Sequence, residues 1–312
     1  MRVIAPSLRP LAEALALAPS LLDRASDGDA VITASFVEGP AVVLGSLQHA
    51  GRVVDVSACA TADTPVHRRF TTGTAVYIKQ RVVLWTLALP HVAALYPDAT
   101  PRTLLNRNVR GFLRGLSRGT APAQYFGREW IAIHHRPAAL LGFEALPDGR
   151  IVIEVFAGLN GTIALPTALC AQEERDVDRW RGKEPLALGP RHAEALALQV
   201  INAVAAHTRS GLEHAELPAD PMLAPPIEDP CSPVPSGLTL AAPRRAPIGW
   251  IDAASDPASG RLWLGGDALV ASYALGALSG AVARGEAIAP GEAPIAGATW
   301  DDFVEAGRAA LG

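Results

Sequence analysis

Apolar and polar positions repeat with two different periods along this chain, and the changes of period predict where helices and strands lie. Residues 11–22 repeat apolar side chains at helical spacing and end at the polar stretch 23–29, so we expect an amphipathic helix there. Two strand-like runs follow within residues 30–48, divided by a turn at 38–40. We interpret residues 74–78 and 81–89 as another strand pair.

The middle of the chain continues with long apolar stretches of both kinds. A helix is expected at residues 100–118, with Thr100 or Thr103 as its cap and Phe112 in its apolar stripe. Further strands are predicted at 129–135, 138–146 and 150–159. A second strong helix is predicted at 190–212. The last two strands are joined by the turn Pro147-Asp148-Gly149.

A proline-rich stretch divides the chain. Residues 216–237 hold seven prolines in 22 residues, which indicates a linker. A short tail with two strands and two helices follows, from about residue 238 to 312. We therefore predict an α+β chain with a large mixed domain at 1–215, a linker at 216–237 and a small domain at 238–312.

Composition narrows the class of protein. Apolar residues make up 49% of the 312 and charged residues 19%, which is typical of a globular chain. A net charge of −4 argues against general nucleic-acid binding. The sequence has no uninterrupted run of about 18 apolar residues, so no membrane span is expected. The cysteines Cys59, Cys170 and Cys231 are too scattered for a disulfide framework, so a cytoplasmic location fits best.

The stretch "HRRFTTGTAVYIK", residues 67–79, holds the most informative candidate chemistry. Arg68 and Arg69 carry charge and can donate two hydrogen bonds each to a carboxylate or phosphate. Residues 71–75 are small or hydroxylated, so a ligand could approach their backbone closely. The alternative interpretation is a β-turn that carries two solvated arginines.

The order of features along the chain resembles the biotin/lipoate protein ligase family, which also includes octanoyltransferases. That family has a signature of the form Arg-Arg-x-Thr-Gly-Gly-Gly-Ala-Val-Tyr-His, and matching places here are held by Arg68, Arg69, Thr71, Gly73, Ala75, Val76 and Tyr77. Upstream, "AVVLGSLQ" is similar to a family strand that ends in Leu-Gly-x-x-Gln, with Gly45 and Gln48 in place. The resemblance covers residues 10–165 in order, and the tail resembles the accessory domain of lipoate ligases more loosely.

This resemblance implies a fold, an activity and partners. The fold would be class II synthetase-like: a mixed, mostly antiparallel sheet packed with helices, plus a small α+β C-terminal domain. The protein would bind a lipoyl, octanoyl or biotinyl acid as its acyl-adenylate and pass it to a lysine of a lipoyl or biotinyl carrier domain. ATP and lipoate or octanoate are the implied cofactors, with Mg as a further candidate. The implied substrate-binding residues are Arg68, Arg69, Thr71, Thr72, Gly73, Thr74, Ala75, Tyr77, Gly45 and Gln48.

Several positions depart from the family pattern. The family lysine follows the arginine that aligns with Arg136, and that place is Pro137, which has neither charge nor donor. Thr72 and Thr74 replace two glycines, and Ile78 stands where a histidine is expected. These departures support the alternative of an inactive member that serves as a ligand- or carrier-binding subunit of a partner ligase.

Another residue of the chain would have to supply the charge that Pro137 lacks. Lys79 or Arg136 could take over the electrostatic role, whereas Lys183, the chain's second lysine, lies in a polar segment and is expected to be solvated. Cys170 is interpreted as a buried apolar thiol, not as an acyl carrier. His134 and His135 are expected at a strand end, on opposite faces, so they do not predict a metal site.

Overall fold

The computed structural model describes residues 1–26, 28–117, 121–189, 193–206, 213–216, 232–286 and 293–312. Its largest element is a nine-stranded sheet in the order β12-β1-β3-β7-β11-β10-β9-β8, with β2 added beside β3. The pairs β1–β3, β1–β12 and β2–β3 are parallel, and the remaining pairs are antiparallel. The strands are β1 (Arg2–Val3), β2 (Ser7–Leu8), β3 (Val31–Glu38), β7 (Arg81–Leu89), β8 (Ala123–Tyr125), β9 (Trp130–Ile133), β10 (Arg136–Ala145), β11 (Ile151–Gly158) and β12 (Glu213–His214).

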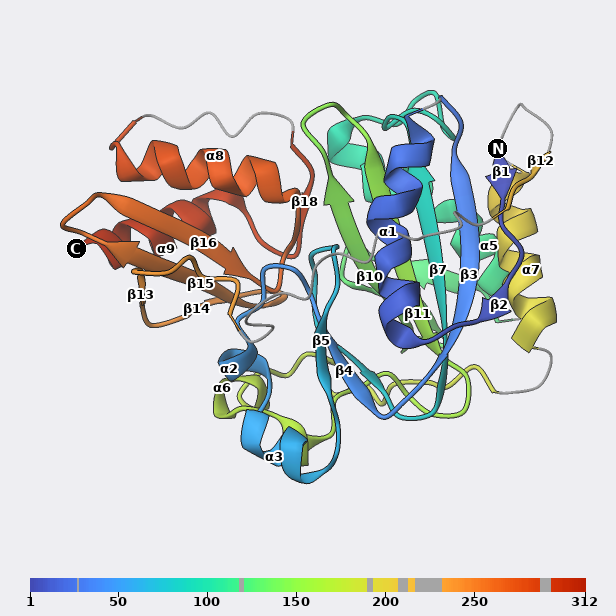
Figure 1. Ribbon diagram of the computed structural model, residues 1–312, viewed down its shortest axis with the longest axis horizontal. Helices are drawn as coiled ribbons and strands as arrows, with labels where there is room; N and C mark the ends of the chain where they lie inside the picture. Colours follow the sequence, from blue (N-terminus) through green and yellow to red (C-terminus); the bar gives the residue numbers. More distant parts are fainter. Residues whose placement is uncertain (27, 118–120, 190–192, 207–212, 217–231, 287–292) are drawn as a thin grey trace.

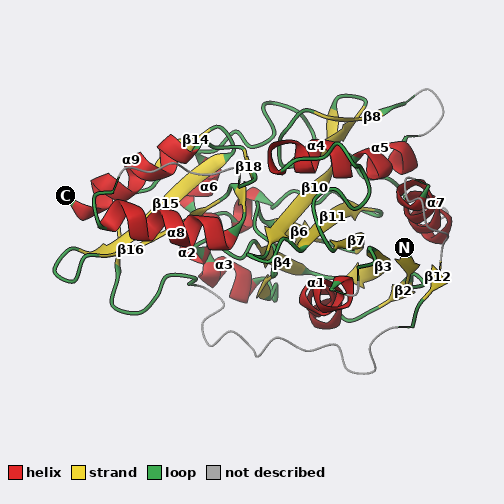
Figure 2. Ribbon diagram, turned by 90° about the horizontal axis from the view of Figure 1, so that it is seen from above, coloured by secondary structure: helices red, strands yellow, loops and turns green. Residues whose placement is uncertain are grey.

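Helices cover both faces of this sheet, which explains why its central strands are apolar at nearly every position. Helix α1 (Leu11–Ala25) packs on β3, β7 and β11. The opposite face carries the 3₁₀ turn η1 (Pro101–Thr103) and the helices α4 (Leu104–Asn108), α5 (Arg110–Leu116) and α7 (Ala193–Ala205). Figure 2 shows the sheet between α1 on one side and α4 and α5 on the other.

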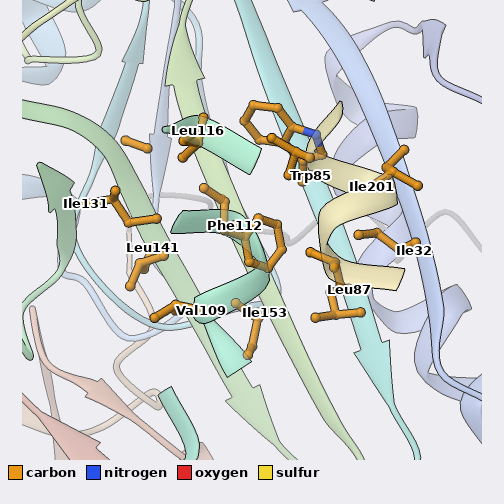
Figure 3. Packing of buried hydrophobic residues seen from close by; sticks show 14 of the residues in the cluster. Ile32, Trp85, Leu87, Val109, Phe112, Leu116, Ile131, Leu141, Ile153 and Ile201 are labelled. Atoms are coloured by element: carbon orange, nitrogen blue, oxygen red, sulfur yellow. The ribbon is translucent and has the colours of Figure 1, made fainter. Parts of the chain in front are cut away.

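The main hydrophobic core lies between the sheet and these last helices. Figure 3 shows Phe112 of α5 among strand residues such as Trp85 and Ile153, with Ile201 of α7 nearby. All four side chains are at most 1% exposed. The same cluster includes Leu269 and Ala271, so the C-terminal part of the chain packs into this core.

A smaller sheet and several short helices lie beside the large sheet. The strand order is β5-β4-β6, with β4 (Ala41–Leu44), β5 (Val66–Arg68) and β6 (Val76–Ile78). Four short elements accompany it: α2 (Ala50–Val53), α3 (Val56–Thr61), η2 (Thr167–Leu169) and α6 (Gln172–Arg175). In Figure 1, α2, α3 and α6 lie at the bottom of the view, next to β4 and β5.

The C-terminal elements have a hydrophobic cluster of their own around Phe303 and Leu264. The central strand β15 (Gly249–Asp256) pairs with β13 (Thr239–Leu240), β14 (Arg244–Ala246) and β16 (Arg261–Gly266). The short strands β17 (Leu269–Val270) and β18 (Ile295–Ala296) pair with each other, and α8 (Ser272–Ala283) and α9 (Trp300–Leu311) pack on β16. The predicted boundaries at 215 and 238 stay predictions, because residues 217–231 of the proposed linker lie outside the described ranges.

Most predicted elements are present, and the predicted α+β class is confirmed. The proposed pairing of 74–78 with 81–89 is wrong: β6 pairs with β4, and β7 pairs with β3 and β11 in the large sheet. The helix predicted at 100–118 is divided into η1, α4 and α5, and residue 118 lies outside the described part. None of the described helices is long and apolar enough to cross a membrane.

His134 and His135 are not at a strand end as expected. They form the two-residue turn between β9 and β10, with positive φ values of 51° and 59°, and the flanking Ile133 and Arg136 pair directly. Two consecutive residues with positive φ are typical of a type I′ hairpin, in which glycine and asparagine are the usual residues. His134 and His135 therefore do not alternate between the two faces of a strand.

Candidate functional site

The Arg-Arg loop, defined as residues 68–75, connects β5 to β6 and turns inward between the large sheet and the C-terminal elements. Its hydroxyl-bearing residues Thr71, Thr72 and Thr74 are 0% exposed, and Arg69 is 1% exposed. Ala75 is buried with Val42 and Leu44 of the small sheet. The alternative of an exposed turn with two solvated arginines therefore does not describe this loop.

The Arg69 guanidinium is held by groups of its own loop. Its Nε donates to the Thr71 hydroxyl (2.9 Å), and its Nη2 donates to the carbonyls of Thr72 (3.1 Å) and Thr74 (2.9 Å). The ring of Phe156 lies beneath it, 5.3 Å from the guanidinium carbon to the ring centre. In this conformation the buried Arg69 side chain therefore stabilises the shape of the loop by hydrogen bonds to Thr71, Thr72 and Thr74.

Glu154 of β11 supplies the counter-charge. Its Oε2 lies 4.0 Å from Arg69 Nε and accepts a hydrogen bond from the Thr71 hydroxyl. Burial raises the pKa of Glu154, and the nearby guanidinium opposes that rise. The pKa of Arg69 is lowered to about 10, mainly by burial, which still leaves the guanidinium protonated at neutral pH.

Some polar atoms in this cluster have no partner among the described residues. They are Arg69 Nη1, Thr74 Oγ1 and Glu154 Oε1. Buried polar groups are nearly always hydrogen-bonded, so each of these atoms could still bind a water or another polar group. The loop thus keeps donors and acceptors that its own contacts do not use.

The C-terminal part closes over the same loop. The Thr72 hydroxyl donates to the Phe143 carbonyl (2.7 Å) and accepts from the amide of Val270 in β17 (3.1 Å). Gly73 has φ +105°, and a Cβ there would stand 2.7 Å from Leu269 Cδ2. The space beside the loop is therefore occupied by β17.

The upstream motif with Gly45 and Gln48 fixes the loop from the other side. Arg68 Nη1 donates to the carbonyls of Gly45 and Gln48, both at 2.7 Å. Gln48 accepts from the Gly45 amide (2.9 Å) and donates to Asp267 of the C-terminal part (2.5 Å). The structure thus brings Gly45, Gln48, Arg68 and the loop together, and their proposed role in substrate binding stays a prediction.

The two candidate catalytic residues lie elsewhere. Lys79 is exposed in the bend after β6, beyond the far end of that strand from the loop. Arg136 pairs with Glu184 (3.0 Å) at the start of β10, whereas Phe143, seven residues along the same strand, contacts the loop. At about 3.3 Å per residue along the strand, this separation is about 23 Å. Neither residue adds a cation to the loop in this conformation.

Pro137 is buried in β10, and its carbonyl accepts from the amide of Leu186 (2.7 Å). The position of the family lysine is thus covered by a later segment of the chain. Lys183 of that segment is exposed, as expected. Tyr77 is half-buried against the cluster of the small sheet.

The cysteines do not supply a nucleophile in the described residues. Cys170 is buried and its thiol contacts the Pro166 carbonyl (3.3 Å), and burial raises its pKa to about 11. The pKa of Cys59 is also raised, first by burial. Thiols with raised pKa values are poor nucleophiles at neutral pH. Cys231 lies outside the described residues, and within those residues no group of three His, Cys, Asp or Glu could hold a metal ion.

Three acidic residues, Glu144, Glu154 and Asp267, lie at this site although the sequence pattern did not assign them to it. Glu154 and Glu144 stand inside apolar strands. A carboxylate in an apolar strand is costly to bury without a partner, so its presence indicates a buried polar or charged partner. Glu144 accepts hydrogen bonds from the amide (2.8 Å) and the hydroxyl of Ser272, and burial raises its pKa to about 7. Asp267 accepts from Gln48, from the Trp250 amide (2.8 Å) and from Arg179.

Comparison with known proteins is consistent with this geometry. Residues 10–131, which contain the whole loop, match the model of the lipoyl protein ligase A/B catalytic domain. These residues, which make up less than half of the chain, are similar to that catalytic domain. No curated protein matches the chain by sequence.

Solved structures show the same ligase-like fold. P. falciparum LipL1 in complex with lipoate aligns with a TM-score of 0.53 at 14% identity, over 69% of this chain and 66% of that one. A bi-partite lipoate protein ligase of Thermoplasma acidophilum, solved with its E2 lipoyl domain, aligns with a TM-score of 0.52 at 13% identity, over 70% and 89%. At these identities the likeness concerns the fold, and it confirms the class II synthetase-like, lipoate/biotin ligase-type architecture.

Proposed function

We propose that this lipoyl protein ligase-like chain does not adenylate an acid and instead serves as a binding subunit for a lipoyl- or biotinyl-type carrier protein in the cytoplasm. The observation that carries this proposal is the burial of Arg69. Its side chain is fully covered, and three of its donor contacts go to the loop itself. Charge that develops in the transition state is stabilised by preorganised donors or cations, and Pro137 supplies neither at the position of the family lysine.

The carrier assignment is supported by the fold. The T. acidophilum ligase of the same fold is described as bi-partite and was solved with its E2 lipoyl domain. A ligase-like chain without adenylation chemistry would keep the carrier-facing surface and leave activation of the acid to a partner ligase subunit.

A second candidate is an active ligase or acyltransferase that uses ATP, Mg²⁺ and lipoate or octanoate. The unpartnered Arg69 Nη1 and Thr74 Oγ1 favour it, because they could hold a carboxylate or phosphate oxygen once β17 has moved. For this second candidate, Lys79 or Arg136 would have to approach the loop to supply the cation.

Pyrophosphate exchange with ATP and Mg²⁺ separates the two candidates. Lipoate, octanoate and biotin are each tested with the full chain, and we expect no exchange with any of them. Titration with an apo-carrier domain is expected to give saturable binding without added acid. Exchange that is lost in Lys79→Met or Arg136→Gln, but kept in the exposed control Arg308→Gln, would establish the enzyme instead.

A further inference from the structure

A cavity of about 430 Å³ lies in the C-terminal part of the chain, between α8 and β16, where Figure 1 shows the helix crossing above the strand. Its walls include Leu47, Trp263, Leu264 and Leu275, so much of its surface is apolar. The volume falls in the range of about 300–1,000 Å³ that is typical of small-molecule sites. None of the lining residues belongs to the Arg-Arg loop.

The helix side of this cavity is lined by small residues. Gly276, Gly280 and Ala283 face it from α8, and a Cβ added to Gly276 would have no neighbour within 4 Å. On the strand side, the ring of Trp263 lies on Gly265, where a Cβ would stand 2.2 Å from a ring carbon. The indole therefore occupies space that only a glycine leaves open, which fixes it as a flat apolar wall.

The charged residues that line the cavity are both arginines. Arg261 is exposed at the strand side, and Arg284 lies at the end of α8. Glu286 accepts from Nε and Nη2 of Arg284 (2.6 and 2.8 Å), whereas Nη1 lies close to Gly280, 3.2 Å from where its Cβ would be. The serine hydroxyls at the cavity, Ser272 and Ser279, donate to Glu144 and to the Leu275 carbonyl.

An apolar hollow with Arg261 at its edge, and with the Nη1 group of Arg284 that Glu286 does not hold, fits a ligand that is aliphatic along its length and anionic at one end. We propose that this cavity binds a medium-chain carboxylic acid, with its hydrocarbon chain against Trp263 and Leu275 and its carboxylate at Arg261 and Arg284. Guanidinium groups bind carboxylates through charge-assisted hydrogen bonds, and burial of the chain supplies the hydrophobic contribution. Because this site shares no residue with the Arg-Arg loop, it is independent of the proposed loss of adenylation.

Calorimetric titration of the full chain with octanoate tests the assignment. We expect saturable binding of one octanoate, and an affinity about tenfold lower for octan-1-ol, which keeps the chain and loses the charge. Gly276→Leu places a side chain in the hollow at a position without a clash and should weaken octanoate binding by about tenfold or more. The double variant Arg261→Gln/Arg284→Gln should reduce the preference for octanoate over octanol to nearly one.

Arg308→Gln on the exposed face of α9 is the matched control and should bind octanoate as the parent protein does. Circular dichroism establishes that each variant is folded; if Gly276→Leu fails to fold, the double arginine variant decides the question. The proposal is overturned by the lack of saturable binding, by equal binding of octanoate and octanol, or by binding that survives Gly276→Leu. The last result would place the acid elsewhere, including at the Arg-Arg loop.

Discussion

The carboxylate of Glu154 lies 4.0 Å from the guanidinium of Arg69, and neither side chain is exposed to solvent. The two residues come from β11 and from the Arg-Arg loop, so their contact holds the loop against the large sheet. A buried charge without its partner is costly, whereas apolar replacement of both partners is often tolerated. This relationship makes the structural role of Arg69 measurable apart from any ligand.

Arg69→Met should therefore lower the free energy of unfolding by about 3–5 kcal/mol, because Glu154 stays buried without its counter-charge. The double variant Arg69→Met/Glu154→Leu should recover most of that loss. Urea unfolding of the parent, both single variants and the double variant measures the coupling energy. Arg308→Met, on the surface, should change stability by less than about 0.5 kcal/mol. Equal effects of Arg69→Met and Arg308→Met would show that the pair does not stabilise the fold.

The contact between Gly73 and Leu269 gives a second prediction. Alanine at Gly73 would have both an unfavourable positive φ and a Cβ 2.7 Å from Leu269 Cδ2. Gly149 is the matched control, since its φ is +93° and nothing lies within 4 Å of its added Cβ. We expect Gly149→Ala to cost about 1–2 kcal/mol from the backbone alone, and Gly73→Ala to cost about 1–3 kcal/mol more from overpacking.

Thermal or urea unfolding of both variants measures the difference. Combining Gly73→Ala with Leu269→Ala should cost less than the sum of the two single changes, because the smaller side chain removes the clash. Strict additivity would mean that β17 does not press on the loop in solution.

Helix packing gives a third prediction. Gly111 and Gly115 of α5 lie against α7, and a Cβ on Gly115 would stand 2.5 Å from the backbone Cα of Val200. Gly115→Ala must push the helices apart and should cost about 1–3 kcal/mol despite the better helix propensity of alanine. Gly276→Ala, in a helix position without neighbours, should instead add about 0.5–1 kcal/mol of stability. Differential scanning calorimetry compares the two, and a stabilised Gly115→Ala would contradict the packing.

The sequence predicted the elements whose own pattern is strong. Strands β10 and β11 and helices α8 and α9 follow from periodicity and turn residues, because these are local signals. The order of motifs also singled out the loop and the residues Gly45 and Gln48, whereas their contacts with Arg68 come from the structure. Pairing across the chain was not predictable in this way: β6 and β7 are adjacent in sequence but belong to different sheets.

The closure of the loop by the C-terminal part could not be read from the sequence. In the fold, Leu269 contacts Gly73 and Val270 contacts Thr72, although nearly 200 positions separate the two segments. Neither segment has a sequence pattern that predicts contact with the other. Buried carboxylates were the one local hint. Glu144 and Glu154 interrupt apolar strands, and each proves to bind a polar group from a distant segment.

The contact of Glu144 with Ser272 gives a prediction for pH dependence. Burial raises the pKa of Glu144 from 4.5 to about 7 in the folded protein, against the effect of the Ser272 donors. Between pH 4.5 and 7 the folded protein therefore holds a proton that the unfolded chain has lost. Stability must fall as pH rises through this window and level off above it.

Asp252, whose pKa is also raised to about 7 by burial, acts in the same direction. Glu144→Gln should remove the part of the pH dependence that is due to Glu144. From pH 5 to pH 8, the free energy of unfolding of the variant should therefore rise by about 1–3 kcal/mol relative to that of the parent protein. Urea unfolding at half-unit pH steps measures both curves, with Arg308→Gln on the exposed face of α9 as a control that should leave the slope unchanged, because an arginine does not titrate in this pH range. Parallel curves for Glu144→Gln and the parent would show that Glu144 titrates as an ordinary exposed glutamate, and would exclude it as a pH-sensitive contact between the large sheet and α8.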